Sequence, residues 1–516
     1  MSGDEITFGW LPGTLVAPEL LNECAQLYSQ HYGVWSARAP KLAGMRIRLS
    51  ESRIRGWLSG RGRPAIWYAR SGKTLIGYAI AVQDECRGYG RISWVTQLVV
   101  HTDFRRRSVG KRLLFSIWGF SDDYAWGLLS ANPYAIRALE KATRRRCQPA
   151  IIAEHARRVE SFARRNIHYF PEKKHPRVSA NSATIDTGFL VDHSNVSEKI
   201  RNVESEHAWL LGPLEEGHEW FAFTFREQPQ IPLSPDELSK MLAATDDIAK
   251  DAYSRMTLDE NHTWAKHAPY EVEKIVAYCQ LRPGSSVLDV GSGNGRHCIE
   301  LSKRGMNCLG TDFAETLVTK ATKKTAEANV SGVQFRCEDF RSAALGRQFD
   351  AVICLYDVIG TYPENADNQR IIGNLAKHVK AGGHVLISVM NYESTEHFAT
   401  NTFSLEREPD KLLALAPSNV MEKTGNIFDP RYLMIDPQTQ VVYRYEQFVK
   451  GTELPIQLLV RDRRFKQEEV ESMCESAGLK VEWSRIVRAG DWETSLDPRD
   501  VKAKEILLLC RKPERD

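Results

Sequence analysis

The sequence predicts an α/β protein of two domains, with a mixed sheet in the N-terminal half and a parallel sheet in the C-terminal half. Its 516 residues exceed what one hydrophobic core usually covers. The proline-rich segment 228–235 can continue neither a strand nor a helix. Strand-like runs follow one another closely before this segment, whereas strands and helices alternate after it. We therefore expect domains at residues 1–232 and 233–516.

In the N-terminal half, three apolar runs are typical of antiparallel strands joined by short turns. They lie at residues 66–70, 75–82 and 91–100. The expected later elements are a helix over 110–120, a strand near 126–131, a helix over 133–146 and closing strands at 209–211 and 220–225. Few helices among many strands indicate a mixed α+β sheet.

In the C-terminal half, helices near 236–279 precede alternating strands and helices from 285 to about 390. This alternation predicts a parallel sheet. Residues 395–463 interrupt it with a strand-like run at 441–449, which predicts a β-rich insertion or a substrate lid. The alternation returns with a helix at 466–477 and strands at 479–487 and 504–511.

A strand, a glycine turn and a helix follow one another at residues 286–301. The apolar run 286–290 leads into Gly291, Gly293 and Gly295, and a helical pattern follows. This arrangement lets a nucleotide-like ligand approach the backbone at a helix N-terminus. Asp289, just before the glycines, favours a cationic, amine-bearing ligand over a pyrophosphate. The turn therefore indicates S-adenosylmethionine (SAM) rather than NAD.

Acidic residues end the next two strands. Asp312 follows Gly291 at close to the ~20-residue offset at which a carboxylate binds a ribose diol. Asp339 ends the following strand, where it can accept from an adenine amino group. With these features, residues 250–514 resemble a class I SAM-dependent methyltransferase with a Rossmann-like sheet. The resemblance implies SAM contacts from Asp289, Gly291, Gly293, Gly295, Asp312, Asp339, Phe340 and Leu355.

Methyl transfer needs mainly a nucleophile placed in line with the methyl group. The resemblance therefore identifies no catalytic residue. The fourth strand ends in Leu355-Tyr356-Asp357-Val358, without the Asn/Asp-Pro-Pro-Tyr/Phe motif of related enzymes that methylate amino groups of nucleic-acid bases. Such bases are thus disfavoured as acceptors. Tyr253, His267 and Tyr270 lie in the preceding helices, where related enzymes close over the methionine end, and packing is the alternative role for each.

A basic turn precedes the predicted helix at 110–120. With Arg105, Arg106, Arg107, Ser108, Val109, Gly110 and Lys111, residues 97–114 resemble the acetyl-CoA segment of a GNAT N-acetyltransferase, with Ser108 in place of the first glycine. Backbone N–H groups, a helix N-terminus and guanidinium groups suit a pyrophosphate. The alternative is a basic loop before an ordinary helix. The resemblance implies acetyl-CoA contacts from residues 105–111 and from Leu98, Val100 and Asn132.

The helix that begins at Asn132 resembles a second segment of that family, with one departure. The position that commonly holds a tyrosine general acid is Leu139, which carries no transferable proton. Either the thiolate leaves without this acid, or Tyr134 or another residue replaces it, or the domain only binds. His101 and Asp103 are the candidates for a general base.

The leading hypothesis is a bifunctional transferase that methylates and acetylates a small molecule or an amine on a larger molecule. A methyltransferase with a non-catalytic acyl-CoA-binding or sensing module is the alternative. A third hypothesis, modification of tRNA or another nucleic acid, rests on the basic residues 1–200, with 30 Lys and Arg against 17 Asp and Glu, and on Arg144–Arg146. These arginines close a predicted helix, where cations also offset the helix dipole.

Several classes of protein are disfavoured. No apolar run approaches the ~18–20 residues of a membrane span, and the acidic N-terminus does not resemble a signal peptide. The ten cysteines include no C-x-x-C pair, so we expect no metal site. Cysteines inside apolar runs fit a reduced, cytoplasmic environment.

Overall fold

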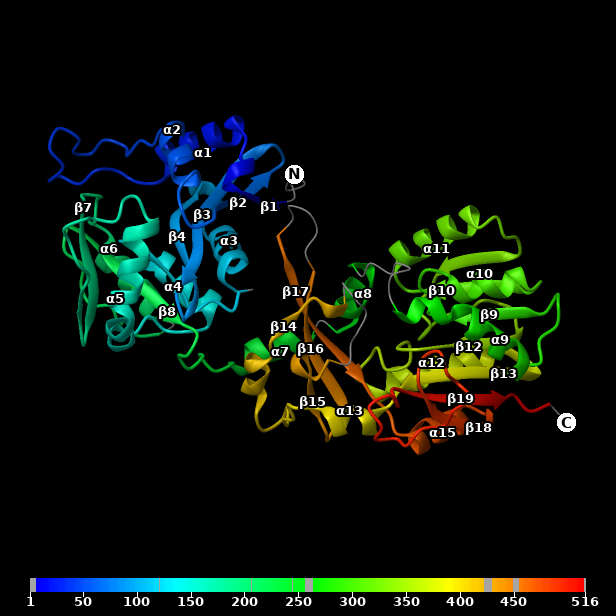
Figure 1. The fold of residues 1–516 in the computed structure, drawn as a ribbon. Coiled ribbons are helices and arrows are strands. Elements are labelled where there is room, and N and C mark those ends of the chain that lie inside the picture. The colour runs from blue at the N-terminus through cyan, green and yellow to red at the C-terminus, as the bar shows by residue number, and fades with distance from the viewer. Residues whose placement is uncertain are drawn as a thin grey trace. The chain divides into compact units, whose positions relative to one another are not determined.

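The computed structural model describes residues 6–119, 121–205, 207–243, 245–255, 263–421, 429–448 and 454–514. The chain forms two compact units (Figure 1). The first consists of Met1–Pro232 with the short segment Val449–Pro455, and the second of Leu233–Phe448 with Ile456–Asp516.

The first unit is built on an eight-stranded mixed sheet, in the order β1-β2-β3-β4-β5-β8-β7-β6. Its strands are β1 (Ile6–Pro12), β2 (Pro64–Ser71), β3 (Thr74–Cys86), β4 (Gly90–Val100), β5 (Ala125–Ser130), β6 (Arg177–Ser179), β7 (Ser182–Phe189) and β8 (Gly217–Phe225). Strands β4 and β5 pair in parallel, and the other neighbours pair antiparallel. The mixed sheet predicted for this half is confirmed.

Helices of the first unit pack on this sheet through apolar stripes. They are α1 (Pro18–His31), α2 (Glu51–Leu58), α3 (Val109–Trp118), α4 (Pro133–Thr143) and α5 (Pro149–Asn166). Helix α6 (Val196–Glu204) packs against α4. Helix α4 begins where the Asn132 side chain accepts a hydrogen bond from the Tyr134 amide, with Pro133 in its first turn. It ends before the predicted residue 146, because Arg144 takes a left-handed conformation with φ of +51°.

The prediction of a strand at residues 209–211 is wrong. These residues form a loop, and the Trp209 indole donates a 2.9 Å hydrogen bond to the Gly212 carbonyl. Trp209 also packs edge-on against Trp220, with ring centroids 4.7 Å apart. The apolar run is therefore explained by side-chain packing under a loop and not by strand pairing.

The second unit contains a seven-stranded sheet, in the order β11-β10-β9-β12-β13-β19-β18. Its strands are β9 (Ser286–Val290), β10 (Asn307–Asp312), β11 (Val333–Cys337), β12 (Phe349–Cys354), β13 (Val379–Met390), β18 (Lys480–Val487) and β19 (Glu505–Arg511). Strands β9 to β13 pair in parallel, as expected for residues 285–390, whereas β19 is antiparallel to both of its neighbours. The connection from β18 to β19 contains no helix, and an antiparallel pair needs no helical crossover.

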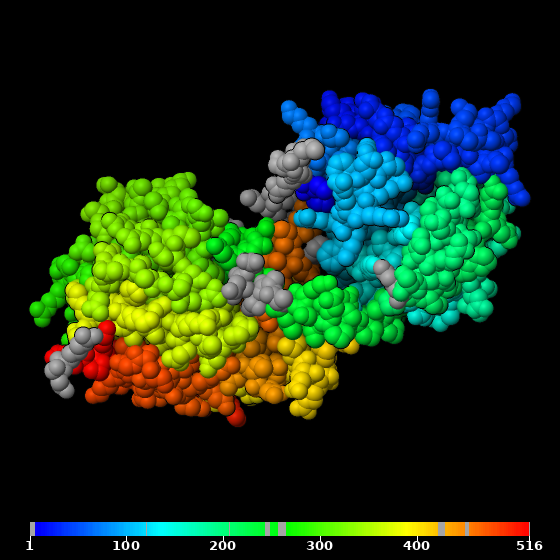
Figure 2. Space-filling model, turned by 180° about the vertical axis from the view of Figure 1, so that it is seen from behind, coloured from blue at the N-terminus to red at the C-terminus, as the bar shows by residue number. Residues whose placement is uncertain are grey.

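The helices of the second unit are α7 (Pro235–Ala243), α8 (Thr245–Arg255), α9 (Ala268–Tyr278), α10 (Arg296–Lys303), α11 (Glu315–Glu327), α12 (Asn365–His378), α13 (Tyr392–Phe398) and α15 (Gln467–Ser476). Residues far apart in sequence meet in this unit. Figure 2 shows the red and orange C-terminal segment lying along the yellow segment, in agreement with the pairing of β19 with β13. Within the described ranges, no helix has the length and apolar character needed to cross a membrane.

The β-rich insertion expected at 395–463 forms a separate four-stranded sheet. Its strands are β14 (Pro417–Ser418), β15 (Met434–Asp436), β16 (Val441–Phe448) and β17 (Ile456–Arg463). Strand β16 pairs with all three others. The insertion sheet is joined to the seven-stranded sheet at the end of β17. There the Arg463 amide donates a 2.7 Å hydrogen bond to the Gly360 carbonyl in the loop after β12.

Candidate functional site

The glycine turn after β9 keeps its backbone exposed to a ligand. Gly291, Gly293 and Gly295 have φ angles of +71°, +54° and +78°, which side chains rarely adopt. A Cβ on Gly291 would lie 2.2 Å from Val358, and one on Gly295 would lie 2.6 Å from Phe335. Both the conformation and the close neighbours therefore require glycine here. Helix α10 begins immediately after Gly295 and directs its N-terminus at the turn.

Asp312 lies at the end of β10 and is bonded to this turn. One carboxylate oxygen accepts a 3.0 Å hydrogen bond from the Gly293 amide, and the other accepts a 2.9 Å bond from the Ala314 amide. Asp312 is 6% exposed, and burial raises its pKa to about 6. A carboxylate has about four lone-pair sites, so capacity remains for the two hydroxyl groups of a ribose.

Three other predicted SAM residues lie at the same edge of the sheet. Asp289 is buried in β9, where burial raises its pKa and the Cys298 thiol donates to it over 3.4 Å. Leu355 is buried just after β12, and Phe340 is buried just after Asp339. Since β9, β10 and β12 are parallel neighbours, the carboxyl ends of these strands meet at one edge. The predicted contacts with SAM stay a prediction.

Asp339 differs from its neighbours because it holds an internal partner. Its carboxylate accepts from Nε of Arg341 at 3.1 Å and from Nη2 at 2.6 Å. Although burial acts to raise it, the pKa of Asp339 is lowered by this hydrogen-bonded pair. An adenine amino group at this position would share the carboxylate with Arg341.

A buried polar cluster that sequence reasoning missed fixes the other side of the turn. Glu271 of α9 lies 2.8 Å from Nε2 of His297 and accepts a hydrogen bond from the Tyr356 hydroxyl. Arg296 lies 3.7 Å from the same carboxylate. Although burial acts to raise it, the pKa of Glu271 is lowered by His297 and Arg296. The cluster joins α9, α10 and the end of β12 across distant parts of the sequence.

The three aromatic candidates of the preceding helices have different positions. The ring of His267 packs against Gly490, where a Cβ would lie 2.4 Å from Nδ1. The Tyr270 hydroxyl accepts a 2.9 Å hydrogen bond from the Trp492 amide. These two residues support the loop at 490–492, whereas Tyr253 donates a 3.1 Å hydrogen bond to Asp357.

In the first unit, the candidate acetyl-CoA site begins where β4 leaves β5. The two strands pair from Ile92 to Val95, and β4 continues to Val100 beyond that pairing. Leu98 and Val100 lie on this continuation, and both are half-buried. Among the described residues, the buried Oε1 of Gln97 has no hydrogen-bond partner. The strand edge therefore offers polar atoms to an extended ligand.

The basic turn lies directly after this strand edge. Arg106 and Ser108 have φ angles of +63° and +60°, and α3 begins at Val109. Within the described part of the chain, no side chain caps this helix N-terminus, so its first amides are available to an anion. Arg106, Arg107, Ser108 and Lys111 are exposed. Gly110 allows close packing on β4, since its Cβ would lie 3.4 Å from Val100.

Arg105 has a different role from its two neighbours. Its Nε donates a 3.2 Å hydrogen bond to the Val100 carbonyl, and its Nη2 donates to the His31 carbonyl. It therefore ties the turn to β4 and α1. Asn132, predicted to contact acetyl-CoA, caps α4 through the Tyr134 amide, so its side-chain oxygen already holds one donor.

The predicted catalytic candidates of the first unit are spread out. Nδ1 of His101 accepts a 3.2 Å hydrogen bond from the Asp103 amide, and the Asp103 side chain is 80% exposed. The Tyr134 hydroxyl accepts a 3.1 Å hydrogen bond from Asn202. Leu139 is fully buried in the core, so this position cannot present a proton donor to the edge of the sheet. The catalytic role of His101, Asp103 and Tyr134 stays a prediction.

Glu219 is a buried acid that sequence reasoning missed. It lies on β8 one residue before Trp220, which pairs with Ser130 at the carboxyl end of β5. Burial raises the pKa of Glu219 to about 7, and a hydrogen bond from Thr187 opposes that shift. Burial and then the Glu219 charge raise the pKa of Tyr28 and of Tyr169. The signal was present, since strand alternation puts Glu219 on the same face as Phe221 and Phe223.

The arginines that suggested nucleic-acid binding make contacts within the first unit. Arg144 donates to the carbonyls of Ile231 and Pro232, and Arg145 donates to those of Thr143 and Arg226. Arg146 pairs with Glu140 at 3.0 Å. These contacts bind segments of the unit together, and the role of this cluster in nucleic-acid binding stays a prediction. Among the described residues, no group of three or more His, Cys, Asp or Glu could hold a metal ion.

Two known families match this chain. The methyltransferase domain family matches residues 287–383, which contain the glycine turn and Asp312. The acetyltransferase (GNAT) family matches residues 24–142, which contain β4, the basic turn and α4. The chain carries a methyltransferase domain and a GNAT acetyltransferase domain. Both resemblances and the α/β fold class are thereby confirmed, the chain is an enzyme, and the expected cofactors, SAM and acetyl-CoA, are those of the two families.

Similar curated proteins are methyltransferases. A dTDP-3-amino-3,4,6-trideoxy-alpha-D-glucopyranose N,N-dimethyltransferase of Streptomyces venezuelae is 26% identical over 201 residues, 39% of this chain and 77% of that protein. A ubiquinone biosynthesis O-methyltransferase of Coxiella burnetii is 34% identical over 109 residues, 21% of this chain and 44% of that protein. The CcbJ methyltransferase of Streptomyces caelestis, a solved structure, has a TM-score of 0.39 at 17% identity and covers 52% of this chain and 98% of its own.

Proposed function

We propose that this chain is a bifunctional transferase, with methyl transfer from SAM at residues 233–516 and N-acetyl transfer from acetyl-CoA at residues 1–232. The observation that carries the methyltransferase part is the glycine turn held to Asp312. SAM supplies an electrophilic methyl group when bound. The chain supplies a carboxylate for the ribose, a backbone without side chains beside the ligand, and a helix N-terminus.

The acetyltransferase part is supported by the N-terminus of α3, which no side chain of the described residues caps and which follows an exposed basic turn beyond the pairing of β4 with β5. Transfer forms a nitrogen–carbon bond, breaks the thioester carbon–sulfur bond and removes a proton from the amine. We propose Glu219 as the group that takes this proton. Glu219 lies on β8 next to Trp220, which pairs with the carboxyl end of β5. The raised pKa of Glu219 suits a general base near neutral pH.

We propose an amine on a small molecule as the acceptor of the methyl group. The similarity to an amino-sugar N,N-dimethyltransferase supports this choice, as does the absence of the nucleic-acid motif at Leu355–Val358. The test is incubation of the full chain with SAM and a dTDP-linked 3-amino sugar, and separately with acetyl-CoA and the same acceptor. Mass spectrometry should detect the gain of one or two methyl groups and of one acetyl group. Failure of either transfer over a panel of primary amines would remove that activity.

The buried Leu139 favours a second candidate function. In this second function, the first unit binds an acyl-CoA without transferring the acetyl group, and the bound acyl-CoA changes the rate of methyl transfer. This candidate predicts acetyl-CoA binding, no acetylated product, and a methylation rate that changes with acetyl-CoA concentration. Modification of tRNA stays a prediction, and it requires an RNA affinity that falls steeply with salt.

A further inference from the structure

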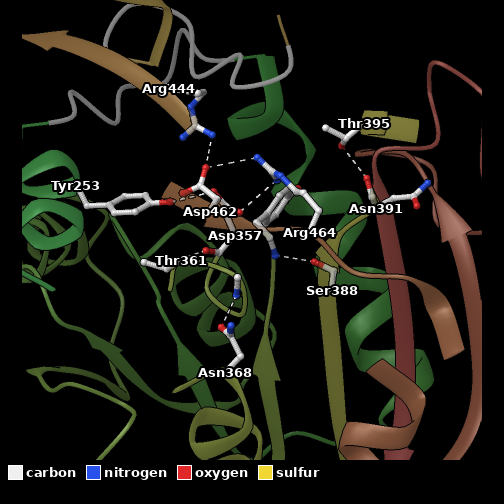
Figure 3. A network of polar contacts seen from close by, with 12 residues as sticks. Tyr253, Asp357, Thr361, Asn368, Ser388, Asn391, Thr395, Arg444, Asp462 and Arg464 are labelled. Carbon is white, nitrogen blue, oxygen red and sulfur yellow. Dashed lines mark hydrogen bonds and ion pairs between the residues drawn. The ribbon is translucent and has the colours of Figure 1, made fainter. Parts of the chain in front are cut away.

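A buried cluster of charged residues lies between the loop after β12 and the insertion sheet (Figure 3). Asp357 belongs to the loop, Arg444 to β16 and Asp462 to β17, and Arg464 follows β17. Arg444 is hydrogen-bonded to Asp462. Arg464 lies 3.5 Å from Asp357 and 3.5 Å from Asp462, so it connects the two carboxylates. All five side chains, Tyr253 included, point toward a common centre in Figure 3.

This cluster lies beside the candidate SAM turn. Asp357 immediately precedes Val358, the residue against which Gly291 packs. Tyr253 of α8 fixes the Asp357 side chain by its 3.1 Å hydrogen bond. In a sheet of this kind, the loops after the strand ends carry the groups that bind ligands. The cluster thus occupies the side of the cofactor turn from which the insertion sheet approaches.

The charges of the cluster are not balanced. Three carboxylates, those of Asp357, Glu446 and Asp462, face the two guanidinium groups of Arg444 and Arg464. Arg444 and Asp462 are at least nine-tenths buried. Among the described residues, Oδ1 of Asp462 and Nη2 of Arg444 have no hydrogen-bond partner. Buried charged groups without partners are costly, so a negative excess with an unused acceptor favours a cationic ligand.

We propose that Asp357 and Asp462 bind the amine of the methyl acceptor, and that Asp357 takes its proton. This inference rests on the proposed methyl transfer. The acceptor enters as an ammonium ion, and one N–H proton passes to the Asp357 carboxylate. The nitrogen lone pair then forms a bond to the methyl carbon, and the carbon–sulfur bonding pair stays on sulfur. The products are a methylated ammonium ion, S-adenosylhomocysteine (SAH) and a protonated Asp357.

Burial and the neighbouring Asp462 raise the pKa of Asp357 to about 6, which places the group in the range of a general base near neutral pH. The competing explanation is that these ion pairs only hold the insertion sheet to the loop after β12. In that case the protein would lose folding stability when Asp462 is changed, but it would not distinguish ligands that carry an amine from ligands that lack one.

Sinefungin provides the probe, because it resembles SAM but carries an amine-bearing carbon where SAM has its methylsulfonium. Calorimetry on the full chain should show that sinefungin binds about tenfold more tightly than SAH, which has no amine at that place. Asp357→Asn and Asp462→Asn should each remove most of this preference while the SAH affinity changes less than about twofold. The control is Asp350→Asn, at the opposite end of β12, where the carboxylate contacts Ser286 and Lys380.

The outcomes separate this inference from the proposed function. If the unchanged chain binds SAH without preferring sinefungin, the amine site is wrong and the SAM site stands. The amine site is also wrong if both variants lose SAH and sinefungin affinity in equal proportion. If the unchanged chain binds neither compound, the proposed methyl transfer itself fails.

Discussion

The amide of Gly293 donates a 3.0 Å hydrogen bond to the carboxylate of Asp312, which couples the glycine turn to the neighbouring strand. This contact places an ionisable group at the proposed ribose position. Burial raises the pKa of Asp312 to about 6, so the carboxylate is ionised above that pH and protonated below it. The pair therefore connects cofactor affinity with pH.

We expect SAH affinity to be constant above pH about 7 and to fall by up to about tenfold per pH unit below pH about 6, because a protonated Asp312 accepts fewer hydrogen bonds. Calorimetric titration of the full chain over this range measures the effect. Asp312→Asn should bind weakly at every pH, and Asp339→Asn should keep the dependence on pH, since the pKa of Asp339 is lowered. An unchanged affinity through this range would contradict the ribose role.

Because the pKa of Glu219 is raised in the folded protein, we predict that folding stability depends on pH. Its folded pKa of about 7 exceeds the value of about 4.3 in an unfolded chain. The folded form therefore binds the proton more tightly, and its free energy of unfolding decreases as pH rises between these two values. Glu219→Gln should raise the free energy of unfolding by roughly 2–3 kcal/mol near pH 8 and by little near pH 4.5. Urea unfolding followed by circular dichroism measures this difference.

The control for that substitution is Glu215→Gln, because the Glu215 side chain is 81% exposed. It should leave the free energy of unfolding unchanged at both pH values. Equal effects of Glu219→Gln at the two pH values would show that ionisation of this residue does not affect folding. The same variant should also slow acetyl transfer if Glu219 acts as the base.

Glu140 belongs to a buried ion-pair network, and we predict that this network contributes to the free energy of unfolding. Both its oxygens are used, by Arg137 and by Arg146 with the Cys147 amide, and Arg137 also donates to the Val203 and His207 carbonyls. Glu140→Ala removes the carboxylate that pairs with Arg137 and Arg146, which should cost about 3–5 kcal/mol of unfolding free energy. Glu51→Ala, which removes an exposed pair with Arg55, should cost only ~0.2–1 kcal/mol. Comparable denaturation midpoints for both variants would refute the network's role.

From the geometry at Gly295 we predict that the glycine turn cannot carry a side chain at this position. Gly295→Ala puts a Cβ 2.6 Å from Phe335 at a φ of +78°, so we expect at least a tenfold loss of SAH affinity. Gly284→Ala is the matched control, because Gly284 has a φ of +91° with open space around its Cβ position. It carries only the backbone cost of about 1–2 kcal/mol and should keep SAH affinity. Equal affinities of the two variants would contradict the close approach.

Much of the fold and part of the site follow from local sequence patterns. The spacing between Gly291 and Asp312 is fixed by the glycine turn, one helix and one strand, so it could be predicted directly from the sequence. The alternation of strands and helices likewise predicted that the strands between residues 285 and 390 are parallel. The reversed β19 could not be read, because its direction depends on a helix-free connection that carries no periodic signal.

The side chains that complete the candidate sites come from distant parts of the chain. Glu271 meets Tyr356 across 85 residues, and Asp357 meets Arg464 across 107. Such pairs form only when the sheet and the insertion are assembled. The sequence could identify a basic cluster at Arg144–Arg146, but only the folded structure showed that its donors bind backbone carbonyls and Glu140.

The central claim is that one chain binds two group-donor cofactors at separate sites, and calorimetric titration of the full chain with acetyl-CoA and with SAH tests it most directly. We expect each ligand to bind at a single site whether or not the other is present. Replacing Arg106, Arg107 and Lys111 with alanine should weaken acetyl-CoA binding at least tenfold and leave SAH binding unchanged. Absence of acetyl-CoA binding to the unchanged chain, or an equal loss of both ligands in the variant, would contradict the account.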